Sequence, residues 1–137
     1  MPRSIHAALL LVLVLLIAGC GGTGSSASFK EGRTIYGDIC SACHGSRGQG
    51  GVGPSLDSVI ETWPTCDAHV EWVEVGSEGW SQRYGDTYGA TDKPVQGGMP
   101  AHGNVLTLEE MRLVAAFERI SYGGQSEADA FEDCRVG

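Results

Sequence analysis

The stretch Cys40-Ser41-Ala42-Cys43-His44 decides how the rest of this sequence is interpreted. Two thiols about one helical turn apart can add to the two vinyl groups on one edge of a porphyrin, and the histidine that follows can direct its imidazole at the iron. The pattern therefore indicates covalent attachment of a haem. A redox-active dithiol is the alternative for a bare C-x-x-C, but it does not require the histidine. A zinc site would need a second pair of ligands at similar spacing, which the sequence lacks.

An iron held by one histidine needs a second axial ligand or an open position. Gly97-Gly98-Met99-Pro100 places a methionine on a loop about 55 residues after His44. The glycines allow the backbone to approach a ring, and the proline stiffens the loop. A methionine thioether raises the reduction potential because it favours the reduced iron. Met99 is therefore the predicted distal ligand, with His102, His69 or an open iron as the alternatives.

In their order along the chain, these motifs resemble the class I c-type cytochromes, which are single-haem electron carriers. The segments that carry the resemblance are Gly32-Arg33-Thr34-Ile35-Tyr36, Cys40 to Gly45, Gly51 to Leu56, Gly98 to Ala101, and Leu106 to Glu110. The resemblance as a whole runs from about Phe29 to Tyr122. The resemblance implies an all-α cytochrome c fold, in which the N- and C-terminal helices cross and short helices and long loops surround one covalent haem c.

The resemblance also implies a role for each site residue. Cys40 and Cys43 would attach the haem, His44 and Met99 would bind its iron, and Pro54 would offer a backbone carbonyl to His44. No catalytic residue is implied, because an iron with both axial positions filled leaves no room for a substrate. We therefore expect a one-electron carrier and not an enzyme. A haem-bearing subunit of a larger oxidoreductase complex, or a gas- or peroxide-binding haem domain with a labile sixth ligand, stays open.

Length and charge limit the possible partners. The chain has 137 residues, 17 acidic and 9 basic side chains, and a formal net charge of -8. This length suits one domain. A nucleic-acid partner is not expected, because a phosphate backbone requires clustered lysine and arginine. The family resemblance instead implies redox proteins as donors and acceptors, such as a quinol-oxidising complex and a terminal oxidase or reductase.

The N-terminus has the character of an export signal. Arg3 precedes an apolar run, 7–18, which is long enough for a signal-peptide core but too short to span a bilayer. The run ends in Ile17-Ala18-Gly19-Cys20, which resembles the lipobox of bacterial lipoproteins. This predicts lipid on Cys20 and a location on the periplasmic or extracytoplasmic face of the cell membrane. An ordinary signal peptide that ends near a cysteine is the alternative.

The expected domain boundaries follow from these features. Residues 1–19 are the predicted lipoprotein signal peptide, and residues 20–28 are the predicted lipidated cysteine with a flexible Gly/Ser tether. Residues 29–137 form the predicted cytochrome c domain. Within it, Ser28 is expected to cap a helix from Phe29 to Ile39. Thr107 and Glu110 have the spacing of a capping box for the last helix.

The segment 59–98 departs from the compact family pattern because it is long and contains three tryptophans, Trp63, Trp72 and Trp80. We expect these rings to pack in the core, with a wall of the haem crevice or a partner site as the alternatives. The stretch Ala68–Glu74 is compatible with either a short helix or a strand.

Two cysteines remain, Cys66 and Cys134. In an exported protein an even pair of thiols predicts a disulfide, which would pin the acidic tail Gln125–Gly137 over the central segment. The alternative is a metal site made of Cys66, His69 and Cys134, which lacks a clear fourth ligand.

Overall fold

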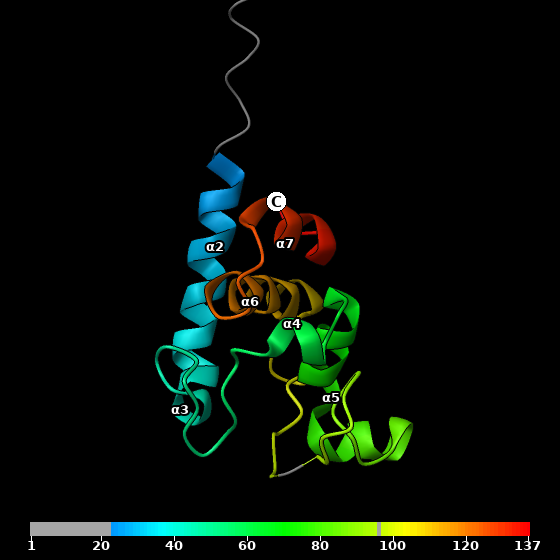
Figure 1. Cartoon of the computed structure of the whole chain (residues 1–137). Coiled ribbons are helices and arrows are strands. Elements are labelled where there is room, and N and C mark those ends of the chain that lie inside the picture. The colour runs from blue at the N-terminus through cyan, green and yellow to red at the C-terminus, as the bar shows by residue number, and fades with distance from the viewer. Residues whose placement is uncertain (1–22, 96) are drawn as a thin grey trace, which may run out of the picture.

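A computed structural model describes residues 23–95 and 97–137, and helices account for its regular structure (Figure 1). In chain order these are α2 (Thr23–Ile35), the π-helical η1 (Tyr36–Cys40), α3 (Ser41–His44), α4 (Val59–Thr62), α5 (Cys66–Tyr84), α6 (Leu108–Ser121) and α7 (Glu127–Cys134). The described residues form no strand beyond an isolated bridge between Thr87 and Pro94. The predicted all-α class is confirmed. The signal peptide and Cys20 lie outside the described residues.

The first helix begins earlier than the sequence predicted. Its described part starts at Thr23, so Ser28 lies inside α2 and does not cap it. The prediction that the helix starts at Phe29 is wrong, and Thr23–Ser28, expected as a flexible tether, is helical. No proline interrupts this stretch, so the helical hydrogen bonds can continue through it, although its glycine, threonine and serines are poor helix formers. At the other end the helical path continues through η1 and α3 to His44.

Helices α2 and α6 cross at close range, as the resemblance implied (Figure 1). A Cβ atom added to Gly32 would lie 2.9 Å from the Cβ atom of Phe117. The Phe117 ring packs against Phe29 and Tyr36 of the same helical path, with ring centroids 5.2 and 5.5 Å apart. The absence of a side chain at Gly32 therefore lets the two backbones meet.

Helix α6 begins with the predicted capping box. The Glu110 amide donates to the Thr107 hydroxyl at 3.2 Å, and the Thr107 amide donates to the Glu110 carboxylate at 2.8 Å. The inner face of α6 is buried and includes Met111, Leu113, Val114, Ala115 and Phe117. However, α6 is not the last helix. The tail that we described only as acidic forms α7, which Ser126 caps by accepting from the Asp129 amide.

The ambiguous stretch Ala68–Glu74 is helical, because it belongs to α5. Thr65 caps this helix by accepting from the Ala68 amide. The three tryptophans are buried and pack together: Trp63 stacks on Trp72 with centroids 5.1 Å apart and meets Trp80 edge-on at 4.8 Å. This agrees with the expected core role. Thus the long central segment adds a helix and an aromatic cluster of its own.

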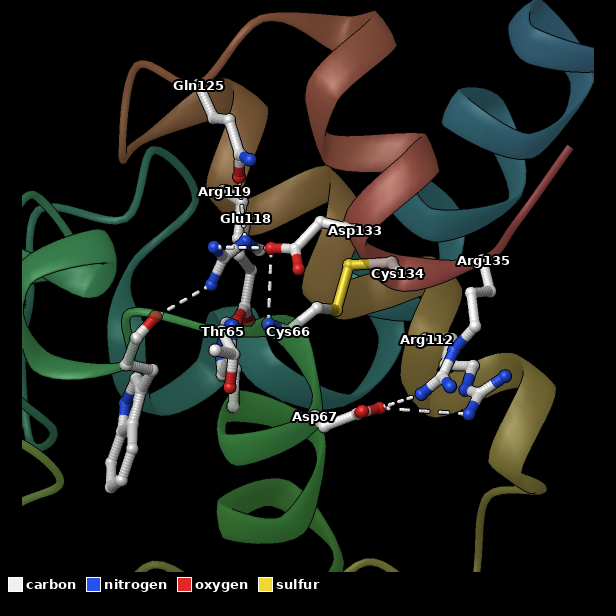
Figure 2. The surroundings of a disulfide bond; sticks show 12 residues. Thr65, Cys66, Asp67, Arg112, Glu118, Arg119, Gln125, Asp133, Cys134 and Arg135 are labelled. Carbon is white, nitrogen blue, oxygen red and sulfur yellow. Dashed lines mark hydrogen bonds and ion pairs between the residues drawn. A yellow bond between two sulfur atoms is a disulfide. The ribbon is translucent and has the colours of Figure 1, made fainter.

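A disulfide joins the start of α5 to the end of α7, between Cys66 and Cys134 (Figure 2). Both residues are almost fully buried. The alternative metal site is wrong, because these two sulfurs bond to each other and His69 pairs with Glu118 through its Nε2. The pairing attaches α7 to the central segment, where the sequence had placed the tail.

Arg119 of α6 is buried beside this disulfide, at 1% exposure (Figure 2). Its guanidinium donates hydrogen bonds to several neighbouring acceptors. It donates to the Trp63 carbonyl at 2.8 Å and to the Asp133 carboxylate at 2.7 Å. Asp133 also accepts from the Cys66 amide at 3.2 Å. Burial lowers the pKa of Arg119, and Asp133 opposes this effect. The network fixes α6, α7 and the start of α5 together.

No helix in the described part of the chain combines the length and the apolar character needed to cross a bilayer.

The crossing of α2 and α6 can be tested with Gly32→Val. Any side chain there must separate the helices, so we expect the free energy of unfolding to fall by about 1–3 kcal/mol. Denaturant titration measures it. Gly37→Ala is the control, because its Cβ atom would meet nothing within 4 Å. The control should be neutral or slightly stabilising, by about 0.5–1 kcal/mol. Equal stability of both variants would contradict the close crossing.

Candidate functional site

A cavity of about 390 Å³ lies between the helix that ends at His44, the aromatic central segment and the loop before α6. Its volume is within the range of about 300–1,000 Å³ that is usual for ligand sites. The five predicted cofactor-binding residues all line it: Cys40, Cys43, His44, Pro54 and Met99. The structure therefore brings together in one cavity residues that are far apart in the sequence.

The two cysteines lie at the junction of η1 and α3, which places them about one turn apart. Neither cysteine takes part in a disulfide; Cys40 is half-buried and Cys43 is exposed. Burial raises the pKa of the Cys40 thiol above its ordinary value, and the nearby Glu118 raises it further. Tyr36 fixes this end of the helical path, because its hydroxyl donates to the Gly45 carbonyl at 2.5 Å.

His44 is oriented by a single hydrogen bond. Its Nδ1 lies 2.8 Å from the carbonyl oxygen of Pro54. A carbonyl only accepts, so Nδ1 carries the proton and the lone pair of Nε2 is free for a metal. This is the contact that the resemblance implied for Pro54, and it is the usual way in which proteins orient a ligating imidazole.

A glycine-rich loop wraps around His44 and makes this contact possible. The Gly50 amide donates to the His44 carbonyl at 2.8 Å, and the Gly53 amide donates to the Cys43 carbonyl at 2.9 Å. These bonds satisfy carbonyls that the end of α3 would otherwise leave open. A Cβ atom on Gly53 would lie 3.0 Å from the His44 ring. The backbone of the loop thus lies directly against the imidazole.

Met99 reaches the cavity from the loop that precedes α6 and is half-buried. The two histidines that we considered as alternative ligands also line the cavity. His69 is engaged, because its Nε2 lies 2.9 Å from the Glu118 carboxylate. His102 has a pKa below its ordinary value because of burial.

The walls of the cavity are largely apolar. Trp63, Trp72 and Tyr88 line it, so part of the aromatic cluster in the core also faces the cavity. The expected core role and the alternative role as a crevice wall therefore both apply. Val52, also in the lining, is 94% exposed. One edge of the cavity thus opens to solvent.

Sequence reasoning missed a buried polar pair at the cavity wall. Glu118 is 4% exposed and His69 is 2% exposed. The Nδ1 atom of His69 has no hydrogen-bond partner among the described residues. The sequence did contain a signal for Glu118: it follows Val114 by four positions, which places it on the buried face of α6. The same spacing relates Arg119 to the buried Ala115.

The cavity residues fit a haem that is held through two thioethers. In the described ranges, no group of three or more His, Cys, Asp or Glu side chains could hold a metal ion alone. His44 and Met99 would supply only the two axial ligands, so a macrocycle must supply the others. Two thiols at helical spacing can attach such a ring, and the apolar walls suit its faces.

The family model described as Cytochrome c matches residues 29–117. No curated protein and no solved structure gives a significant match.

The buried pair can be tested by a double-mutant cycle on Glu118 and His69. Glu118→Leu should lower the free energy of unfolding by about 1–3 kcal/mol, because it leaves a buried imidazole without a partner on either nitrogen. The double variant Glu118→Leu/His69→Leu should cost less than the sum of the two single variants, by about 0.5–3 kcal/mol. Denaturant titration of all four proteins gives the coupling energy. Additive effects would show that the pair does not stabilise the cavity wall.

Proposed function

Because this chain belongs to the cytochrome c family and carries haem c as its cofactor, we propose that it is a membrane-anchored electron carrier with axial ligands His44 and Met99. An electron-carrier role with covalently attached haem and its iron is the property of the family. The proposal adds the two ligands, the anchor on Cys20 and a role as shuttle between components of a respiratory chain.

The arrangement of His44 and Met99 in one cavity carries the proposal. The imidazole is already oriented by Pro54, with Nε2 free, and the thioether reaches the same cavity from a distant loop. When bound, the haem iron supplies the gain and loss of one electron. The protein holds the ring through Cys40 and Cys43 and keeps both ligands fixed.

The apolar walls support the same role. Trp63 and Trp72 give the cavity apolar walls, and electrostatic interactions are stronger in such surroundings than in water. With two protein ligands, the iron has no position for a substrate, which agrees with a carrier and not with an enzyme. The solvent-exposed edge near Val52 offers a route for the electron to a partner protein.

A second candidate function is a gas- or peroxide-binding haem domain with a labile sixth ligand. The observation that favours it is His102, which lines the same cavity three positions after Met99. If Met99 left the iron, the polar side chain of His102 could contact a small molecule bound in its place.

The ligand assignment predicts a lower midpoint potential for Met99→Ala. The thioether favours reduced iron, and each tenfold loss of that preference corresponds to about 59 mV for a one-electron couple. Redox titration of the full-length holoprotein measures the shift. Met111→Leu is the control, because Met111 is buried in the core and does not line the cavity. An unchanged potential in Met99→Ala would contradict the assignment of Met99 as the distal ligand.

The anchor on Cys20 would keep the haem domain near membrane-bound donors and acceptors, such as a quinol-oxidising complex and a terminal oxidase or reductase. Tethering raises the effective concentration of a partner without a new contact. Two or three acyl chains on one lipoprotein cysteine are enough for stable attachment.

Lipidation is tested by labelling bacteria that express the full chain with radioactive palmitate. We expect label in the wild-type protein and its recovery with the membrane fraction. Cys20→Ser should remove both. An unlabelled wild-type protein that is released in soluble form would identify an ordinary signal peptide instead.

A further inference from the structure

Helix α5 is interrupted at Gly76, the one residue in it with non-helical backbone angles, φ 64° and ψ -175°. This φ lies in the left-handed region, which favours glycine. Such a residue breaks the i to i-4 pattern, so carbonyls before it and an amide after it lose their partners within the helix. Buried backbone groups of this kind need other partners.

The loop that carries Met99 supplies those partners. The amides of His102 and Gly103 donate to the carbonyls of Val73 and Glu74, at 3.0 and 3.1 Å. In the opposite direction, the Ser77 amide donates to the Met99 carbonyl at 3.0 Å. Three backbone hydrogen bonds therefore join the interrupted helix to the loop, on both sides of Gly76.

Gly76 also touches the loop directly. A Cβ atom there would lie 2.6 Å from the Met99 carbonyl oxygen and 2.6 Å from the Ala101 amide nitrogen. Any side chain would therefore push the loop away from α5. The position needs glycine for two separate reasons, its backbone angles and this close approach.

Helix α5, which bonds to the Met99 loop, is itself fixed by contacts with other parts of the fold. Its first residue, Cys66, is joined to α7 by the disulfide and donates its amide to Asp133 (Figure 2). Trp72 and Trp80, which lie before and after Gly76, are buried in the aromatic cluster. The backbone groups that have no partner within α5 therefore lie at a fixed place beside the cavity, where the loop can bond to them.

We propose that Gly76 is a positioning residue for the distal ligand: the interruption of α5 holds the backbone of Met99 where its sulfur reaches the haem iron. This inference rests on the proposed ligand role of Met99. A thioether is a weak ligand, and a methionine side chain has three rotatable bonds. Its occupancy of the iron therefore depends on a backbone that is already in place.

The test uses full-length holoprotein in which the methionine methyl groups are labelled with ¹³C. A methyl group held against a haem face has a proton signal shifted strongly by the ring current. We expect this shifted signal in the reduced wild-type protein and its loss from the major species of Gly76→Ala. The midpoint potential of Gly76→Ala should be lower than that of the wild type by at least about 59 mV, which corresponds to a tenfold loss of preference for reduced iron.

Gly85→Ala is the matched control, because Gly85 has φ 90° at the end of the same helix and nothing within 4 Å of its Cβ position. Like Gly76→Ala, this variant places an alanine at a positive φ, but its methyl group would meet no neighbouring atom. The shifted methionine methyl signal should therefore be kept. Ser77→Pro removes the amide that donates to the Met99 carbonyl and also the Ser77 hydroxyl, which donates to the same carbonyl at 3.3 Å. It does so at the first position of a helical segment, where proline is tolerated. It should lose the signal to a larger extent than Ser77→Ala, which keeps that amide.

The outcomes separate this inference from the proposed function. A wild-type protein without a shifted methyl signal would overturn the ligand role of Met99, and the inference with it. A shifted signal in wild type that persists fully in Gly76→Ala and Ser77→Pro would overturn the positioning role alone. Loss of the signal in Gly85→Ala as well would show that backbone strain, and not the loop contact, is responsible.

Should Gly76→Ala and Ser77→Pro fail to fold, hydrogen exchange in the wild-type holoprotein decides. The amides of Ser77, His102 and Gly103 are expected to exchange slowly and as one cooperative unit. Rapid exchange of these amides would overturn the proposal, because the loop would then not be held by α5.

Discussion

The hydrogen bond from His44 Nδ1 to the Pro54 carbonyl, 2.8 Å long, is the contact on which the rest of the site depends. It sets the tautomer of the imidazole and directs Nε2 away from the loop. The glycines around it, Gly50 and Gly53, are needed because the loop must lie against the ring and satisfy the last carbonyls of α3. Without this contact, a histidine at a helix end could rotate freely, and two attachment cysteines would hold a haem with an undirected ligand.

The opposite side of the cavity is built differently, because Met99 lies on a loop without regular structure of its own. Its position depends on an interrupted helix, α5, whose open backbone groups bond to the loop. The disulfide and the Arg119 network fix that helix at its start (Figure 2). The long central segment therefore has a clear physical role: it supports the loop that carries Met99 and provides aromatic rings for the cavity wall.

The sequence predicted the parts whose signals are local. The capping box at Thr107 follows from a short-range pattern, and the helical class is what the family resemblance implied; the structure agrees with both. It could not decide the state of the central segment, because the break at Gly76 depends on a loop more than twenty residues away. The start of α2 was misplaced because Ser28 suits a cap as well as a helix interior. Glu118 was overlooked because a charged residue on an apolar helix face is ordinarily read as exposed, and its partner His69 lies on another helix.

The central claim is that both axial positions of the iron are filled by the protein. The most direct test is the absorption spectrum of the reduced full-length holoprotein, recorded before and after exposure to carbon monoxide. The account predicts an unchanged spectrum, because Met99 occupies the position that the gas would take. Conversion to a carbon monoxide adduct would contradict it, since the iron would then be open or readily opened, and the labile-ligand function would replace that of an electron carrier.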